Sequence, residues 1–197
     1  MLNTKSATTD KNYVVMDLEF NYPNTAFRST KNNIRLGAEI IEIGAVKLDS
    51  NLRETDRYSG YVRPKVYTKM NGKVRELTHI TTEMIHNARP FEEAIPDFLS
   101  WCGDADFLTW SENDIFVLED NMLYNGMEIK DLPECYDVQL MFDDQVMQEG
   151  RRLALSYAAW KLGIETEPCH AALNDAVNTA AILRKIDLPA GFTGYEV

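Results

Sequence analysis

Cysteine is scarce in this sequence, and its spacing excludes the folds and sites that depend on it. The 197 residues contain three cysteines, Cys102, Cys135 and Cys169, and no two of them form a Cys-x-x-Cys pair. An odd, widely spaced set supports neither a disulfide framework nor a zinc ribbon. The pattern is typical of a reducing compartment, and we expect a cytoplasmic protein.

Long apolar runs are also missing. No segment approaches the roughly 18 apolar residues that a membrane-spanning helix needs. The first twelve residues, MLNTKSATTDKN, are polar and lack the apolar core of a secretory signal. We therefore expect no membrane partner. We also expect residues 1–12 and 189–197 to be tails, the first of them flexible, around a single domain of residues 13–188.

Positive charge is in deficit. The chain has 20 Lys and Arg against 31 Asp and Glu, which gives a formal net charge of −11. Proteins that coat nucleic acid non-specifically bind its phosphates mainly through Lys and Arg, so this class is disfavoured. An acidic site that reaches phosphate through metal ions is compatible with the same charge.

The spacing of the apolar residues predicts an α/β fold with a five-stranded mixed sheet flanked by helices. Two extended runs on either side of Asp49-Ser50-Asn51 predict a hairpin, so that the first three strands form an antiparallel meander. Later strands alternate with helices and are expected to be parallel. The expected strands are 13–20, 39–48, 53–62, 106–110 and 135–140. The expected helices are a short one capped by Thr81 or Thr82, and then 91–102, 114–124, 143–149, 153–162 and 171–186.

Two acids end the first strand. Side chains alternate across a strand, so Asp17 and Glu19 point to one face while Leu18 points to the other. Two carboxylates held side by side repel each other unless a cation lies between them, and oxygen ligands suit Mg²⁺ or Mn²⁺. The alternative is that the strand simply ends at the surface with two solvated acids.

Two further acids lie beside or within later expected strands and helices. Asp114 comes after the strand that ends at Trp110, and Asp175 lies in the last expected helix. Ligands in such sheets bind at the carboxyl ends of strands. Five residues separate His170 from Asp175, so the two converge only if His170 sits in the loop before the helix. Pro168 supports a loop there.

Together these segments resemble the DEDDh 3′→5′ exonucleases, the DnaQ-like branch of the RNase H-like fold. Asp17-Leu-Glu19-Phe20 resembles the first motif of that family, Trp110-Ser-Glu-Asn-Asp114 the second, and the run from His170 to Asp175 and beyond the third. Within the family the likeness is to exonucleases that trim RNA ends, including the KapD-like proteins. His79 and Ser111 stand where the family often has glycine, beside the expected site, so they bear on substrate preference.

The resemblance implies a single exonuclease domain over residues 13–188 and a metal-dependent mechanism. Asp17, Glu19, Asp114 and Asp175 would hold two Mg²⁺ or Mn²⁺ ions roughly 4 Å apart, and His170 would act as general base. The product would be a nucleoside 5′-monophosphate released from a single-stranded 3′ end, with RNA favoured over DNA. Phe20, Leu77 and Thr78 are the expected contacts of the terminal nucleotide.

Other interpretations remain open from the sequence. A DNA proofreading exonuclease would carry the same motifs, and a non-catalytic RNase H-like module could bind nucleic acid or protein through the same fold. A core role for Phe20 is as well supported as base stacking. A group of basic residues is expected either to contact phosphates or to form a solvated surface: Arg28, Lys31, Arg35, Lys65, Lys69 and Lys73.

Overall fold

A six-stranded mixed sheet forms the centre of the computed structural model, which describes residues 11–26, 28–186 and 195–197. The strand order is β6-β5-β4-β1-β7-β8. The strands are β1 (Tyr13–Asn21), β4 (Glu39–Leu48), β5 (Glu54–Arg63), β6 (Arg89–Pro90), β7 (Asp106–Thr109) and β8 (Cys135–Asp137). A separate hairpin pairs β2 (Thr30–Lys31) with β3 (Ile34–Arg35). Most residues of the two expected tails, 1–10 and 189–194, lie outside the described residues.

The predicted meander and parallel strands are confirmed. Strand β4 runs antiparallel to both β1 and β5, whereas β7 is parallel to β1 and β8 is parallel to β7. The predicted count of five strands is one too low, because Arg89 and Pro90 pair with the end of β5. A strand of two residues, one of them proline, is too short to show the alternation by which a strand is recognised in a sequence.

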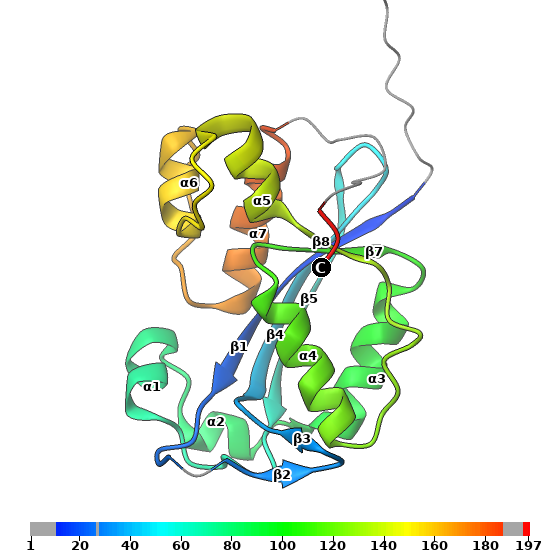
Figure 1. The fold of residues 1–197 in the computed structure, drawn as a ribbon, viewed down its shortest axis with the longest axis vertical. Helices are drawn as coiled ribbons and strands as arrows, with labels where there is room; N and C mark the ends of the chain where they lie inside the picture. The colour runs from blue at the N-terminus through cyan, green and yellow to red at the C-terminus, as the bar shows by residue number, and fades with distance from the viewer. Residues whose placement is uncertain (1–10, 27, 187–194) are drawn as a thin grey trace, which may run out of the picture.

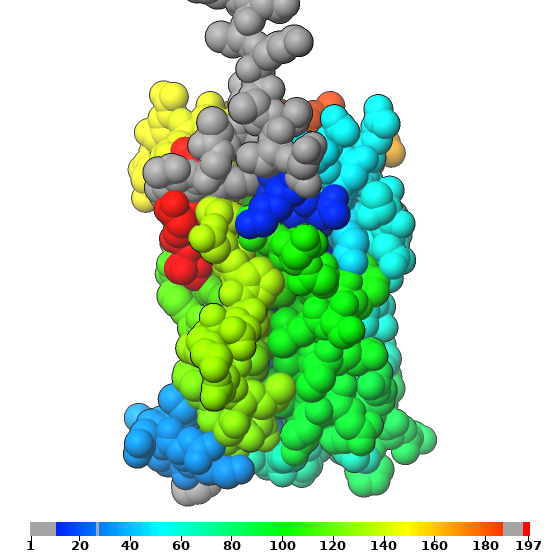
Figure 2. All heavy atoms as spheres, turned by 90° about the vertical axis from the view of Figure 1, so that its right-hand side faces the viewer, coloured from blue at the N-terminus to red at the C-terminus, as the bar shows by residue number. Residues whose placement is uncertain are grey.

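Helices cover both faces of the sheet (Figure 1). They are α1 (Gly72–Thr78), α2 (Thr82–His86), α3 (Phe91–Cys102), α4 (Asn113–Tyr124), α5 (Val138–Phe142), the π-helix η1 (Asp143–Met147), α6 (Leu155–Lys161) and α7 (Ala172–Leu183). Figure 2 shows α3 and the segment between α4 and β8 side by side over one face. Among the described residues, none of the helices has the length and apolar character needed to cross a bilayer.

Strand β1 divides the core in two. Its residues Tyr13 and Val15 pack into the cluster under α5, α6 and α7, and Val14 and Met16 pack into the cluster under α3 and α4. This alternation is the period of two that a strand buried on both faces requires. It directs Asp17, two residues beyond Val15, to the side of the sheet that α7 covers.

The region after β8 differs from the prediction. The strand expected over 135–140 ends at Asp137, and the helix expected over 143–149 is instead the pair α5 and η1. The Asp137 carboxylate accepts a hydrogen bond from the Leu140 amide at 3.0 Å and so caps α5. The last described residues lie against β8, where the Asp137 amide donates to the carbonyl of Tyr195 and the Val197 amide donates to that of Cys135.

Candidate active site

The first two acids lie at the carboxyl end of β1, on the side covered by α7. Both Asp17 and Glu19 are half-buried. Opposite them on β4 are Gly44, which pairs with Asp17, and Glu42, which pairs with Glu19. The register of β1 against β4 shifts between Glu19 and Phe20, so the strand is irregular directly after the acids. A bulge at this place turns the following residues relative to the side of the strand that carries Asp17 and Glu19.

Helix α7 begins directly on strand β4 because Gly44 has no side chain. A Cβ atom at Gly44 would lie 2.0 Å from the backbone nitrogen of Leu173 and 2.1 Å from the carbonyl carbon of Ala172. The Ala172 amide donates to Oε2 of Glu42 at 3.2 Å, so the carboxylate satisfies a free amide at the start of the helix. These two contacts place Asp175, in the first turn of α7, over β1.

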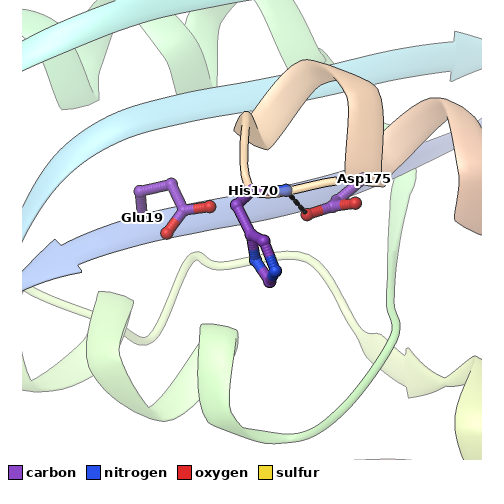
Figure 3. A group of neighbouring side chains, drawn as sticks. All are labelled: Glu19, His170 and Asp175. Carbon is purple, nitrogen blue, oxygen red and sulfur yellow. Dashed lines mark hydrogen bonds between the residues drawn. The ribbon is translucent and has the colours of Figure 1, made fainter. Parts of the chain in front are cut away.

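His170 lies in the loop before α7, where the sequence predicted it. Its φ of 68° is in the left-handed region, and its amide donates to Oδ2 of Asp175 at 2.8 Å. Figure 3 shows the exposed imidazole between the carboxylates of Glu19 and Asp175. One possible ligand atom from each of the three residues lies within 4.8 Å of the others, so this group has the spacing of a metal site.

Asp114 joins the group from the first turn of α4. The residue is buried, and its Oδ1 accepts a hydrogen bond from the Leu18 amide at 3.0 Å. This bond ties α4 to the part of β1 between the first two acids. The structure therefore brings all four predicted acids and His170 to one place at the carboxyl ends of β1 and β7.

The carboxylates strongly perturb one another. Burial raises the pKa of Asp17 well above its usual value, and the charges of Asp114, Asp175 and Glu19 raise it further. Burial and the charge of Asp175 raise the pKa of Glu19 to about 8. Burial also raises the pKa of Asp114 to about 7, against the lowering effect of the Leu18 amide. A site that holds these groups ionised needs a positive partner.

The metal-free protein should lose stability as pH rises from about 5 to about 8. The unfolded carboxyl groups titrate near pH 4, whereas Glu19 and Asp114 titrate at about 8 and about 7 in the folded chain. Between these values the folded state binds more protons than the unfolded state, so a rise in pH favours unfolding. Thermal unfolding in chelator across this range tests it, and a midpoint that stays level or rises would contradict it. Added Mn²⁺ should remove most of the slope.

The three expected substrate contacts lie in different environments. Leu77 is 51% exposed at the end of α1. Phe20 is half-buried against the core cluster under α3 and α4, and the ring of Tyr22 meets it edge-on at 6.1 Å. Thr78 is buried, and its hydroxyl donates to the Val74 carbonyl and accepts from the Ile80 amide. Leu77 is thus the member of the set whose apolar side chain is largely exposed.

Three residues that hold the site together were not singled out from the sequence. Glu42 and Gly44 position α7, and Asn21 fixes the end of β1. The Asn21 side chain is fully buried, donates to the carbonyls of Tyr67 and Lys69, and accepts from the Asn71 amide. An isolated glycine in a strand pattern often marks a close approach of backbone, so Gly44 did carry a usable signal.

Part of the basic group is already paired elsewhere. Lys65 forms an ion pair with Glu92, and the Lys31 ammonium lies 5.7 Å from the ring centre of Tyr124. The Arg28 guanidinium donates to the carbonyl of Thr25. These contacts favour a structural role for the three residues over a phosphate contact.

Comparison with known proteins identifies the family. The family model for exonucleases matches residues 14–183. The chain is 30% identical over 179 residues to the DNA polymerase III subunit epsilon of Aquifex aeolicus, covering 90% of this chain and 81% of that protein. It is 27% identical over 190 residues to the probable 3′-5′ exonuclease KapD of Bacillus subtilis, covering 91% and 86%.

Longer proteins and solved structures extend the likeness. The chain is 32% identical over 185 residues to the PolC-type DNA polymerase III of Clostridium perfringens, covering 93% of this chain and 12% of that much longer protein. The nuclease domain of 3′hExo, a DEDDh family member bound to rAMP, superposes with a TM-score of 0.75 at 20% identity, covering 89% and 90% of the two chains. This chain therefore belongs to the exonuclease family, as one of its DEDDh 3′→5′ exonucleases.

Proposed function

We propose that this protein is a metal-dependent exonuclease that removes nucleoside 5′-monophosphates from single-stranded 3′ ends, with RNA favoured over DNA. The convergence of four carboxylates and an exposed histidine at one edge of the sheet carries the proposal. The exonuclease domain is assigned to residues 13–188, around the segment that the family model matches. Free thiols at all three cysteines support the cytoplasm as its location.

The donor set fits Mg²⁺ or Mn²⁺. Both ions prefer carboxylate oxygens. Burial and then mutual repulsion raise the pKa of Asp17 and Glu19, and a divalent cation between them would relieve the repulsion. Two such ions would be held by the four acids, Asp17, Glu19, Asp114 and Asp175. When bound, they would supply charge neutralisation at the scissile phosphate and a lowered pKa for a water molecule.

The protein's own residues supply the remaining steps. The exposed imidazole of His170 takes the proton of the attacking water, because it stands in a loop between two of the acids. Attack on phosphorus breaks the bond to the 3′ oxygen of the preceding nucleotide, which leaves on the shortened strand. Leu77 packs against the terminal base, and Thr78 maintains the turn that presents Leu77. Phe20 supports the base from the core side.

The preference for RNA rests on related structures. One fold neighbour is a DEDDh nuclease domain bound to rAMP, and another is a 3′-exonuclease that recognises a histone mRNA stem-loop. DNA proofreading is the second candidate, because the chain is similar to the epsilon subunit and to PolC-type polymerases. Both candidates use the same acids and differ in how the site receives the sugar.

Hydrolysis of matched RNA and DNA oligonucleotides tests the proposal. With Mn²⁺ present we expect stepwise shortening of 5′-labelled RNA and release of mononucleotides, more slowly for DNA of the same sequence. Chelator and the Asp175→Asn variant should abolish both reactions. Faster hydrolysis of DNA would favour the proofreading function, and binding without any hydrolysis would favour a non-catalytic module.

A further inference from the structure

A cavity beside the acids is not used by the proposed mechanism. It has a volume of about 330 Å³ and opens between the β7–α4 loop and the start of α6. This volume is at the lower end of the range for small-molecule sites. Asn113, the residue before Asp114, contributes to its wall. The wall also includes Trp110, Ser111, Glu112, Gln139, Arg152 and Leu153.

Arg152 is held in one orientation within this cavity. Its Nη1 contacts the buried carboxylate of Asp137 and donates to Oε1 of Gln139 at 3.1 Å. Its Nη2 donates to Oε2 of Glu112 at 3.1 Å. Because these acceptors meet the edge of the guanidinium, its flat faces are the part left for a ligand. The Arg152 side chain is 41% exposed.

The wall around Arg152 is also fixed. The indole nitrogen of Trp110 and the amide nitrogen of Gln139 both donate to the carbonyl of Leu153, at 3.0 and 2.6 Å. The loop that carries Arg152 is thus tied to β7 and to α5. A preformed cavity costs less ordering on binding than a mobile loop would.

The charges favour a base over a phosphate as the ligand. Two carboxylates, those of Asp137 and Glu112, already contact Arg152, so the group carries no net positive charge to attract an anion. A planar guanidinium stacks on nucleobases, as arginine does in recognition of single strands. Ser111 and Asn113 add polar groups that suit the edge of a base.

The strand order gives the direction of the substrate. Strands β1, β7 and β8 are neighbours in the sheet. Strand β1 carries the first two acids, β7 is followed by the loop to Asp114, and β8 ends at Asp137, which contacts Arg152. Figure 1 shows α6 at the upper left and α1 at the lower left, with the start of α4 nearer the centre, at a height between them. A strand whose terminal base lies at Leu77 on α1 and whose scissile phosphate lies at the acids continues toward the cavity.

We propose that this cavity binds the base of the nucleotide on the 5′ side of the scissile phosphodiester, stacked on the guanidinium of Arg152. The proposal rests on the proposed exonuclease function and adds a second base subsite to it. Each base that stacks on a protein platform contributes measurably to single-strand binding and does so with little regard to sequence. The enzyme should therefore prefer substrates with a base at the penultimate position.

An abasic nucleotide tests the subsite directly. For release of the first nucleotide, an abasic penultimate position should lower kcat/KM of the wild type by about tenfold, whereas an abasic fourth position should change it little. Arg152→Lys keeps the charge opposite Asp137 but has no planar face. In this variant the penultimate abasic effect should fall to within about twofold. Arg151→Lys, at the exposed neighbouring position, is the matched control and should keep the full effect.

A p-nitrophenyl ester of a nucleoside 5′-monophosphate separates the subsite from the acids, because it has no penultimate base. Arg152→Lys should lower kcat/KM about tenfold more for a dinucleotide than for the ester. Should the variant disturb folding, Ala154→Leu, which fills the cavity, gives a second measurement of the same ratio.

Several outcomes would overturn the proposal. If Arg152→Lys lowered kcat/KM equally for the dinucleotide and the ester, Arg152 would act through the acids. If the penultimate abasic nucleotide had the same effect in wild type and Arg152→Lys, the base would bind elsewhere. Wild type that hydrolyses the ester but shows no abasic effect overturns the subsite alone. Wild type that hydrolyses neither substrate overturns the exonuclease function together with it.

Discussion

Replacing Asp17 with asparagine should lower kcat by about a thousandfold and, at the same time, stabilise the metal-free fold. The activity falls because the carboxylate is one of four that would bind metal, and metal ions contribute several kcal/mol of transition-state stabilisation, at about 1.4 kcal/mol per factor of ten. Stability rises because burial and four neighbouring carboxylates raise the pKa of Asp17 well above its usual value. The two effects have opposite signs, which an unfolded variant cannot imitate.

Mononucleotide release with excess Mn²⁺ and thermal unfolding in chelator near pH 8 measure the two effects. Asp104→Asn is the matched control, because Asp104 is an exposed acid in the turn after α3 and should leave both measurements unchanged. An Asp17→Asn variant that retained activity would remove Asp17 from the metal site. A variant that unfolded more easily in chelator would mean that the neighbouring acids do not repel it.

Gly44→Ala should be the most damaging change outside the acids themselves. The new methyl group would lie 2.0 Å from the Leu173 nitrogen, so the start of α7 must move away from β4. Overpacking of this kind costs about 1–3 kcal/mol of stability. The shift also moves Asp175 and His170, and a displacement of about 1 Å in catalytic groups can reduce the rate ~100-fold.

Gly60→Ala is a matched control for this prediction. Gly60 lies on the neighbouring strand β5, where an added Cβ would meet only the Tyr58 ring at 3.7 Å, an ordinary contact. Urea unfolding and kcat should therefore change little in Gly60→Ala and strongly in Gly44→Ala. Equal effects in the two variants would show that loss of glycine from the sheet, and not the contact with α7, is responsible.

Local patterns predicted the main strands well. The alternation along β1 and the turn between β4 and β5 are properties of neighbouring residues, so they can be recognised in the sequence. Helix α1 was missed because it spans seven residues and buries only Val74 and Thr78, too few for a helical period to be visible. The segment from Cys135 was predicted as a strand through Leu140, but the cap from Asp137 ends the strand there and begins a helix.

The sequence alone determined the candidate acids and their order, because Asp17, Glu19, Asp114 and Asp175 lie in motifs that resemble those of the DEDDh exonucleases. Their convergence was decided by tertiary contacts. The Asp114 carboxylate accepts a hydrogen bond from the Leu18 amide, which is 96 residues away in the sequence. The Glu42 carboxylate accepts one from the Ala172 amide, which is 130 residues away. Carboxylates that repel one another do not assemble by themselves, so the packing of α4 and α7 on the sheet must hold them together. Contacts between such distant residues leave no local pattern in the chain.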